Sequence, residues 1–248
     1  MLPASAIRQL PKCYKSIADK MKNKNIHLIA NPLLILLFTI VIYSNSIQNA
    51  FVNWDDDVSI INNDDIHSLD RGHLFNIFNN SYNGMYQPAV MITFAINYAI
   101  QKLQPEVYHI TNLLFHLLNI LLLFIFIKML FRNTILAAVT ALIFAIHPMH
   151  VESVSWITER KDVLYAFFYL SSLILYLKYI QSDYQKRFLL LAFLFYLFSL
   201  FSKTNAVTLP LIMIAIDIYY GRPKSRYAIF EKAVFFLFSI IFGLIAIK

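Results

Sequence analysis

The sequence predicts an all-α polytopic membrane protein of about seven transmembrane helices with a large first outer loop. Of its 248 residues, 59% are hydrophobic and only 14% are charged, whereas a soluble domain carries about 25% charged residues. The hydrophobic residues form long blocks between short charged segments, which is typical of membrane helices. The distribution of basic residues between the blocks then indicates the orientation.

Seven apolar blocks are predicted to span the bilayer, because about 20 helical residues cross ~30 Å of hydrocarbon and about 17 suffice. They are His27–Tyr43, Ile110–Leu130, Thr134–His147, Val163–Ile180, Phe188–Phe201, Ala206–Tyr220 and Ala233–Ile247. The first block is longer than the core of a signal peptide and lacks a small-x-small cleavage site, so we interpret it as an uncleaved helix. Residues 1–26 form a basic segment that we expect to be cytoplasmic, and residues 27–248 form the membrane domain.

The segment Pro88–Leu103 is apolar but contains Thr93, Asn97 and Gln101, so it fits either a span or a helix on the membrane surface. The distribution of basic residues along the chain favours the position on the membrane surface. If this segment does not span and the N-terminus is cytoplasmic, 15 of the 21 Lys and Arg residues fall on the cytoplasmic side. This is the positive-inside pattern of membrane proteins. The net charge of +7 is therefore explained by membrane orientation and not by nucleic-acid binding.

The first outer loop is predicted at residues 44–109 and carries the carboxylates Asp55, Asp56 and Asp57 directly after Trp54. Adjacent carboxylates repel one another, so such a cluster can raise a pKa, bind a cation or meet a positively charged partner. The alternative is a solvated acidic turn with Trp54 at the membrane interface.

The second outer loop is predicted at residues 147–162 and contains His147, His150 and Glu152. Imidazole and carboxylate groups are normal metal ligands, although this His-x-x-His-x-Glu spacing is not a standard zinc motif. The alternative is that Pro148 ends the third span and the polar side chains are solvated.

Three cations are predicted at the same membrane face. Arg160 and Lys161 end the second loop, and the tight turn 202–205 brings Lys203 to that face. Together they suit an anionic lipid phosphate, with ordinary interfacial anchoring as the alternative.

A polar stripe runs along the second span, because His109, Asn112, His116 and Asn119 are spaced by three and four residues. We expect the stripe to face the bundle interior and to form interhelical hydrogen bonds. It also supports an alternative function as a transporter. Asp217 is expected to pair with a cation such as Arg222 and to have no catalytic role.

Several segments resemble the membrane domain of the TMTC family, the tetratricopeptide-repeat O-mannosyltransferases of the GT-C glycosyltransferase superfamily. They are FVNWDDDVSIINN, YQPAVMITFAINYAI, VYHITNLLFHLLN, FAIHPMHVESVSWITERKDVL and the Ser-Lys turn before TLPL. The resemblance covers roughly residues 51–221, the N-terminal part of such a protein, and no 34-residue repeat is present.

The resemblance implies a multispan core with surface helices on the first outer loop. It also implies transfer of a sugar, mannose in the animal members, from a polyprenyl-phosphate carrier to Ser/Thr hydroxyls on the lumenal or periplasmic side. The partners would then be membrane lipid, the lipid-linked donor and a protein acceptor, with a divalent cation as an open possibility.

By resemblance, Asp56 and Asp57 match the Asp pair of the family, with Asp55 an additional acid, and one of them would serve as the base. Glu152 matches an acid that orients the acceptor or holds a cation. The cations Arg160, Lys161 and Lys203 would stabilise the leaving phosphate. Thr204 departs from the family, since many members have an acid after the lysine. Together with the missing repeats and later spans, this leaves a non-catalytic truncated relative as a further alternative.

Overall fold

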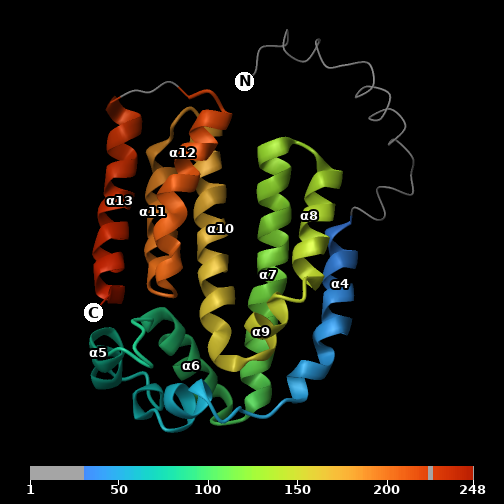
Figure 1. Ribbon diagram of the computed structural model, residues 1–248, viewed down its shortest axis with the longest axis vertical. Coiled ribbons are helices and arrows are strands. Elements are labelled where there is room, and N and C mark those ends of the chain that lie inside the picture. Colours follow the sequence, from blue (N-terminus) through green and yellow to red (C-terminus); the bar gives the residue numbers. More distant parts are fainter. Residues whose placement is uncertain (1–30, 223–225, 248) are drawn as a thin grey trace.

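The computed structural model describes residues 31–222 and 226–247, and within them the fold is helical, with only an isolated bridge between Tyr82 and Met85. Every predicted span coincides with a helix, although the predicted segment 1–26 and the start of His27–Tyr43 lie outside the described residues. These helices lie along the long axis of the molecule and alternate in direction (Figure 1). They are α4 (Pro32–Tyr43), α7 (Pro105–Phe131), α8 (Thr134–Ile146), α10 (Arg160–Gln181), α11 (Lys186–Leu200), α12 (Leu209–Tyr219) and α13 (Arg226–Ile247).

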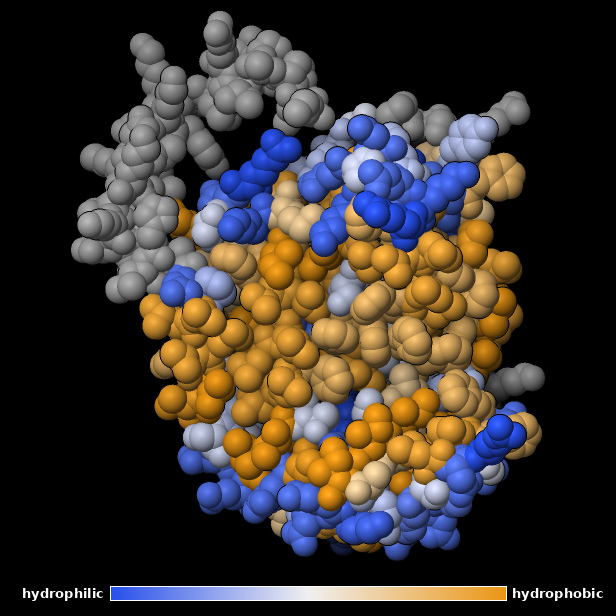
Figure 2. All heavy atoms as spheres, turned by 180° about the vertical axis from the view of Figure 1, so that it is seen from behind, coloured by the Kyte–Doolittle hydropathy of each residue, from blue (hydrophilic) through white to orange (hydrophobic). Residues whose placement is uncertain are grey.

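Among the described residues, three stretches are long and apolar enough to cross a membrane, namely Pro105–Phe131, Ile157–Gln181 and Tyr227–Ile247. Shorter apolar helices accompany them. Figure 2 shows an apolar band between two hydrophilic ends of the molecule. These features indicate a membrane protein, and the number of seven spans stays a prediction.

Four helices begin earlier than the predicted spans, α11 by two residues, at Lys186 instead of Phe188, and three others by three or more. The predicted starts were Ile110, Val163 and Ala233, whereas α7, α10 and α13 start at Pro105, Arg160 and Arg226. The predicted starts excluded the charged residues that precede the apolar blocks, but Glu, Lys and Arg are good helix formers and continue a helix. Pro105 also suits the first turn of a helix. Both predicted outer loops therefore end in the first turns of long helices.

The polar stripe of α7 faces the bundle interior, as expected. Asn112 Nδ2 donates to the carbonyl oxygens of Trp156 (3.0 Å) and Ile157 (3.2 Å). His116 Nε2 lies 3.2 Å from the carbonyl oxygen of Ala145, and Asn119 Nδ2 lies 2.8 Å from that of Val163. The stripe therefore ties α7 to α8, to the second outer loop and to α10.

The first outer loop folds into a small helical layer at one end of the bundle (Figure 1). It consists of η1 (Ser44–Gln48), η2 (Asp57–Ile61), η3 (Asp64–Ile66), α5 (Arg71–Asn79) and α6 (Pro88–Gln101). Buried Ile60, Ile66, Ile77 and Phe94 form its core together with Tyr108 from α7. The predicted loop thus carries helices, and their contact with the membrane surface stays a prediction.

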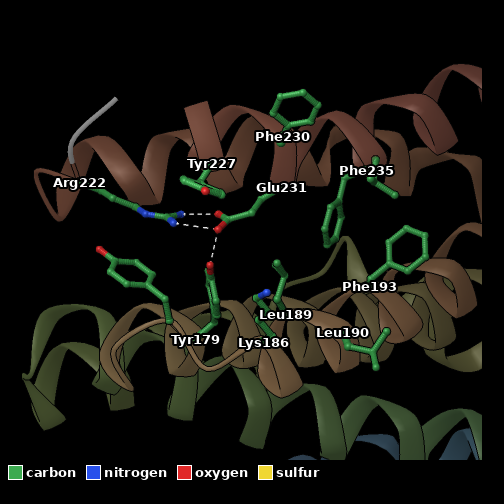
Figure 3. A pocket seen from close by; sticks show the side chains of 12 residues that line it. Tyr179, Lys186, Leu189, Leu190, Phe193, Arg222, Tyr227, Phe230, Glu231 and Phe235 are labelled. Carbon is green, nitrogen blue, oxygen red and sulfur yellow. Dashed lines mark hydrogen bonds and ion pairs between the residues drawn. The ribbon is translucent and has the colours of Figure 1, made fainter. Parts of the chain in front are cut away.

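The opposite end of the bundle is held by a charge network between α12 and α13 (Figure 3). Asp217 lies 3.6 Å from Arg222 and 2.5 Å from Lys232, which confirms the predicted pairing with Arg222. Arg222 also pairs with Glu231 at 2.8 Å, and the Tyr179 hydroxyl donates to the same carboxylate. Every charge of this network has an opposite partner, which agrees with a structural role.

Candidate functional site

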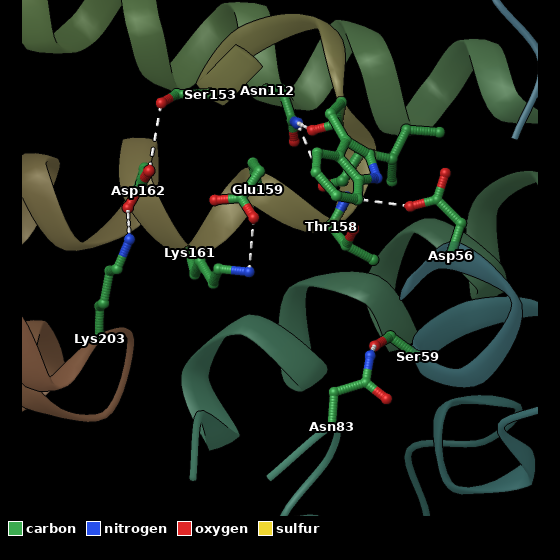
Figure 4. A network of polar contacts seen from close by, with 12 residues as sticks. Asp56, Ser59, Asn83, Asn112, Ser153, Thr158, Glu159, Lys161, Asp162 and Lys203 are labelled. Carbon is green, nitrogen blue, oxygen red and sulfur yellow. Dashed lines mark hydrogen bonds and ion pairs between the residues drawn. The ribbon is translucent and has the colours of Figure 1, made fainter. Parts of the chain in front are cut away.

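Asp56 connects the two outer loops. Its side chain is 1% exposed, and its Oδ2 accepts a hydrogen bond from the backbone N–H of Val52 at 3.0 Å. Its Oδ1 accepts from the backbone N–H of Thr158, 102 positions further along the chain, at 3.2 Å (Figure 4). The carboxylate is thereby fixed at the junction of the loops.

A pocket of about 300 Å³ lies beside this carboxylate. It is lined by Asn49, Ala50, Phe51, Val52, Asp56, His109, Ser155, Trp156 and Ile157. His109 is 2% exposed. Neither its ring nitrogens nor Trp156 Nε1 makes a hydrogen bond of normal geometry within the described residues. Buried polar atoms usually have partners, so these atoms mark the pocket as a place for a polar ligand or water.

Glu152 lines a second pocket of about 390 Å³ that adjoins the first. The two pockets share Val52, Ser155 and Trp156. Trp54, with 73% of its surface exposed, forms part of the outer wall. The structure therefore brings Asp56 and Glu152, one carboxylate from each outer loop, to neighbouring pockets around Trp156.

Asp55 and Asp57 are half-buried beside Asp56, but neither lines these two pockets. Asp57 begins η2, which is a π-helical turn. Such turns are rare in proteins overall, and those that occur are often found at functional sites. Of the predicted Asp cluster, only Asp56 reaches the pockets.

His147 and His150 do not form a metal site with Glu152 in this structure. The described residues contain no group of three or more His, Cys, Asp or Glu side chains that could hold a metal. His150 begins helix α9 (His150–Ser155), so His150 and Glu152, two positions apart, point to different sides of it. His147 Nδ1 accepts the N–H of Met149, and the His150 ring packs on Phe144. Burial, followed by the charge of His147, lowers the pKa of His150.

Arg160 is fully buried, and its guanidinium donates to four uncharged acceptors. These are Asn112 Oδ1 (2.7 Å), Asn97 Oδ1 (2.5 Å), Thr93 Oγ1 (3.3 Å) and the carbonyl oxygen of Tyr108 (2.9 Å). The guanidinium also lies 4.5 Å from the centre of the Phe94 ring. A phosphate would reach this guanidinium only after α6 or α7 moved.

The two lysines have carboxylate partners. Lys161 Nζ lies 2.7 Å from Glu159 Oε1, and Lys203 Nζ contacts Asp162 Oδ1 (Figure 4). Asp162 also accepts a hydrogen bond from the Ser153 hydroxyl at 3.2 Å. The three predicted cations thus separate into a buried guanidinium and two ion pairs, and none of them lines the two pockets.

Comparison with known proteins agrees with the motifs. Human protein O-mannosyl-transferase TMTC1 is 35% identical over 144 residues, which are 54% of this chain and 16% of the relative. Human TMTC3 is 31% identical over 144 residues, 54% of this chain and 15% of the relative. The chain is similar to the TMTC proteins.

A relative from Caenorhabditis elegans, protein O-mannosyl-transferase F38B6.6, matches a longer stretch. It is 29% identical over 229 residues, which are 86% of this chain and 31% of the relative. The matches thus span less than a third of the length of these relatives. No protein-family model and no solved structure matches the chain.

Four residues of this region were not predicted as site residues from the sequence. Glu159 and Asp162 neutralise Lys161 and Lys203, and the alternation of acids and bases over residues 159–162 was the available signal. His109 was predicted only as part of the polar stripe, although its position one turn after Pro105 places it near the outer loops. Trp156 gave no signal beyond its residue type.

Proposed function

We propose that this chain is the core of a membrane glycosyltransferase that transfers a sugar, mannose in the first instance, from a polyprenyl-phosphate carrier to a hydroxyl acceptor at the outer face. The observation that carries the proposal is the fixed carboxylate of Asp56 at the wall of a pocket built by both outer loops. The names of the relatives, protein O-mannosyl-transferases, support the same reaction class.

In the proposed reaction the acceptor oxygen attacks C1 of the sugar, and the bond between C1 and the phosphate oxygen breaks. The electron pair of that bond leaves with the lipid phosphate, which is stable as an anion. The acceptor proton passes to the Asp56 carboxylate, which acts as general base. Since the leaving group needs no protonation, electrostatic stabilisation suffices on its side.

The positions of the other predicted site residues suggest their roles in the proposed reaction. Glu152, in the adjoining pocket, orients the acceptor hydroxyl. Lys161 and Lys203 are the cations for the phosphate, which would compete with Glu159 and Asp162 for them. Arg160, because it is buried, holds the scaffold of the site and does not contact the phosphate.

Two alternatives are separable from this proposal. The polar stripe supported a transporter, but three of its four residues, Asn112, His116 and Asn119, are engaged with backbone carbonyls and are not free to line a transport path. A non-catalytic relative would bind a lipid-linked sugar without turnover, and an activity assay distinguishes it.

The test is Asp56→Asn in the longest natural form of the protein, assayed for transfer from a polyprenyl-phosphate mannose to a Ser/Thr peptide. Because a general base contributes about 10²–10⁴-fold, we expect transfer to fall at least about 100-fold. Asp64→Asn is the matched control, since Asp64 is an exposed carboxylate of the same loop. Unchanged transfer in Asp56→Asn would remove Asp56 as the base, and no transfer by the unmodified protein would favour the non-catalytic relative.

A further inference from the structure

The pocket beside Asp56 contains buried side-chain nitrogens whose hydrogen-bonding capacity the fold does not satisfy. Both ring nitrogens of His109 and Nε1 of Trp156 are buried and make no hydrogen bond of normal geometry within the described residues. The backbone of Asn49, which lines the same pocket, lies within hydrogen-bonding reach of the His109 ring and can engage one ring nitrogen. The second ring nitrogen and Trp156 Nε1 are then left for a ligand. Because buried donors and acceptors rarely remain unpaired, these atoms point to a bound group.

We propose that this pocket binds the sugar ring of the donor, with His109 and Trp156 as its hydrogen-bonding side chains. The inference rests on the proposed glycosyl transfer and deepens it by naming the residues that hold the sugar. Trp156 offers one donor, the neutral imidazole offers a donor and an acceptor, and the Asp56 carboxylate accepts. Hydroxyl groups both donate and accept, so a ring that carries several of them matches this set.

The electrostatics of the pocket favour a neutral ligand over an anion. Asp56 lies in its wall, whereas Lys161 and Lys203 do not line it. A phosphate at this position would be repelled by the carboxylate at short range. The aromatic rings of Phe51 and Trp156 supply apolar faces for the C–H side of a sugar. The phosphate therefore lies outside this pocket, on the side of the lysines.

Trp156 is itself held in place by the fold. Its carbonyl oxygen accepts a hydrogen bond from Asn112 Nδ2 at 3.0 Å, so the residue is anchored to α7, the helix that also carries His109. The same residue separates this pocket from the one that Glu152 lines. A sugar in the first pocket and an acceptor hydroxyl in the second would therefore meet at Trp156.

The chain contains only two tryptophans, Trp54 and Trp156, so Trp54→Phe makes Trp156 the single tryptophan reporter when excitation is selective for tryptophan. In this background we expect D-mannose and its methyl glycoside to change the Trp156 emission saturably. Inorganic phosphate, and glycerol at equal concentration, should leave the emission unchanged. A response to phosphate without one to mannose, or no response to either, would overturn the proposal.

Two substitutions of His109 distinguish a loss of sugar binding from a loss of folding. His109→Leu in the same background should weaken mannose binding at least about tenfold, because it removes the imidazole hydrogen bonds. His109→Gln, which retains a donor and an acceptor, should stay within a few-fold of the parent. Equal binding in all three proteins would contradict the role of His109, and weak binding in both variants would indicate a structural role instead.

A transfer assay distinguishes this inference from the proposed function. Trp156→Phe removes the indole N–H together with the five-membered ring and keeps an aromatic face, so we expect a higher KM for the donor with a smaller change in kcat. Normal transfer kinetics in Trp156→Phe together with a silent fluorescence titration would reject the sugar pocket and leave the glycosyltransferase intact. Saturable mannose binding without transfer by the unmodified protein would reject the enzyme and leave the pocket intact.

Discussion

The buried guanidinium of Arg160 shows how one side chain organises this region. Its acceptors Thr93 and Asn97 belong to α6, while Tyr108 and Asn112 belong to α7. Arg160 itself starts α10. The planar guanidinium suits this task, because its five N–H donors in a rigid fork can serve four acceptors on two helices, whereas a lysine ammonium has only three donors. Three helices, α6, α7 and α10, are therefore joined by one residue.

Replacing Arg160 should accordingly destabilise the fold. In Arg160→Met four buried acceptors lose their donor, and we expect the free energy of unfolding to drop by about 3 kcal/mol or more. Thermal unfolding in detergent measures the change, and the exposed Arg187→Met serves as control. If both variants unfold at the same temperature, Arg160 does not hold the helices together.

At the scale of elements, the first outer loop owes its local structure to side-chain caps. Asp70 precedes α5 and accepts hydrogen bonds from the backbone N–H groups of Gly72 (2.9 Å) and His73 (3.1 Å). Asp65 joins the end of α5 to the following turn, because it accepts from Asn76 and from the Tyr82 hydroxyl, both at 2.8 Å. Carboxylates in this loop thus have structural uses as well.

The stabilisation of α5 by the Asp70 cap is expected to depend on pH. The side-chain and backbone N–H groups of His73, and then the Ser68 hydroxyl, donate to the carboxylate and hold its pKa well below the ordinary value. Because the folded pKa is depressed, the stabilisation is present above the ordinary pKa of about 3.9. It is lost as the pH falls below that value through the folded pKa.

Hydrogen exchange of the α5 amides, corrected for intrinsic rates, measures this effect. We expect constant protection from neutral pH down to about pH 4 and weaker protection below it. Asp70→Asn retains the capping oxygen but cannot titrate, so its protection should lack this step. A loss of α5 protection already between neutral pH and pH 5 would show that another group controls the helix.

For the whole molecule, the site depends on both outer loops lying on one side of the membrane. The hydrogen bond between Asp56 and Thr158 joins the loops, and the charge network of Asp217 and Arg222 lies at the opposite end of the bundle. An even number of spans between the loops is consistent with this arrangement. The apolar band in Figure 2 separates the two ends.

Cysteine accessibility tests the arrangement in intact vesicles. In a Cys13→Ser background, single cysteines at the exposed positions Asn83 and Asn205 should be labelled from one side of the membrane. A cysteine at the exposed Gln185 should be labelled only from the other side. Labelling of Asn83 and Asn205 from opposite sides would break the proposed site, because Lys203 could not then share a face with Asp56.

The sequence by itself determined the helices and their inward faces. Apolar blocks and polar spacing are local properties of the chain, so the seven segments and the buried stripe at Asn112, His116 and Asn119 were predictable. The pairing of Asp217 with Arg222 was predictable for the same reason, since the two residues are five positions apart. The resemblance to the TMTC family added the expected roles of Asp56, Asp57 and Glu152.

Only the tertiary structure decided which of these residues meet. Lys203 contacts Asp162 across 41 positions, and Asp56 meets the backbone of Thr158 across 102. Periodicity carries no information about such contacts, because they depend on how distant helices pack. Packing therefore buried Arg160 among neutral acceptors and gave both lysines carboxylate partners. It also gathered Asp56, His109 and Trp156 around one pocket, which no local pattern of the sequence could indicate.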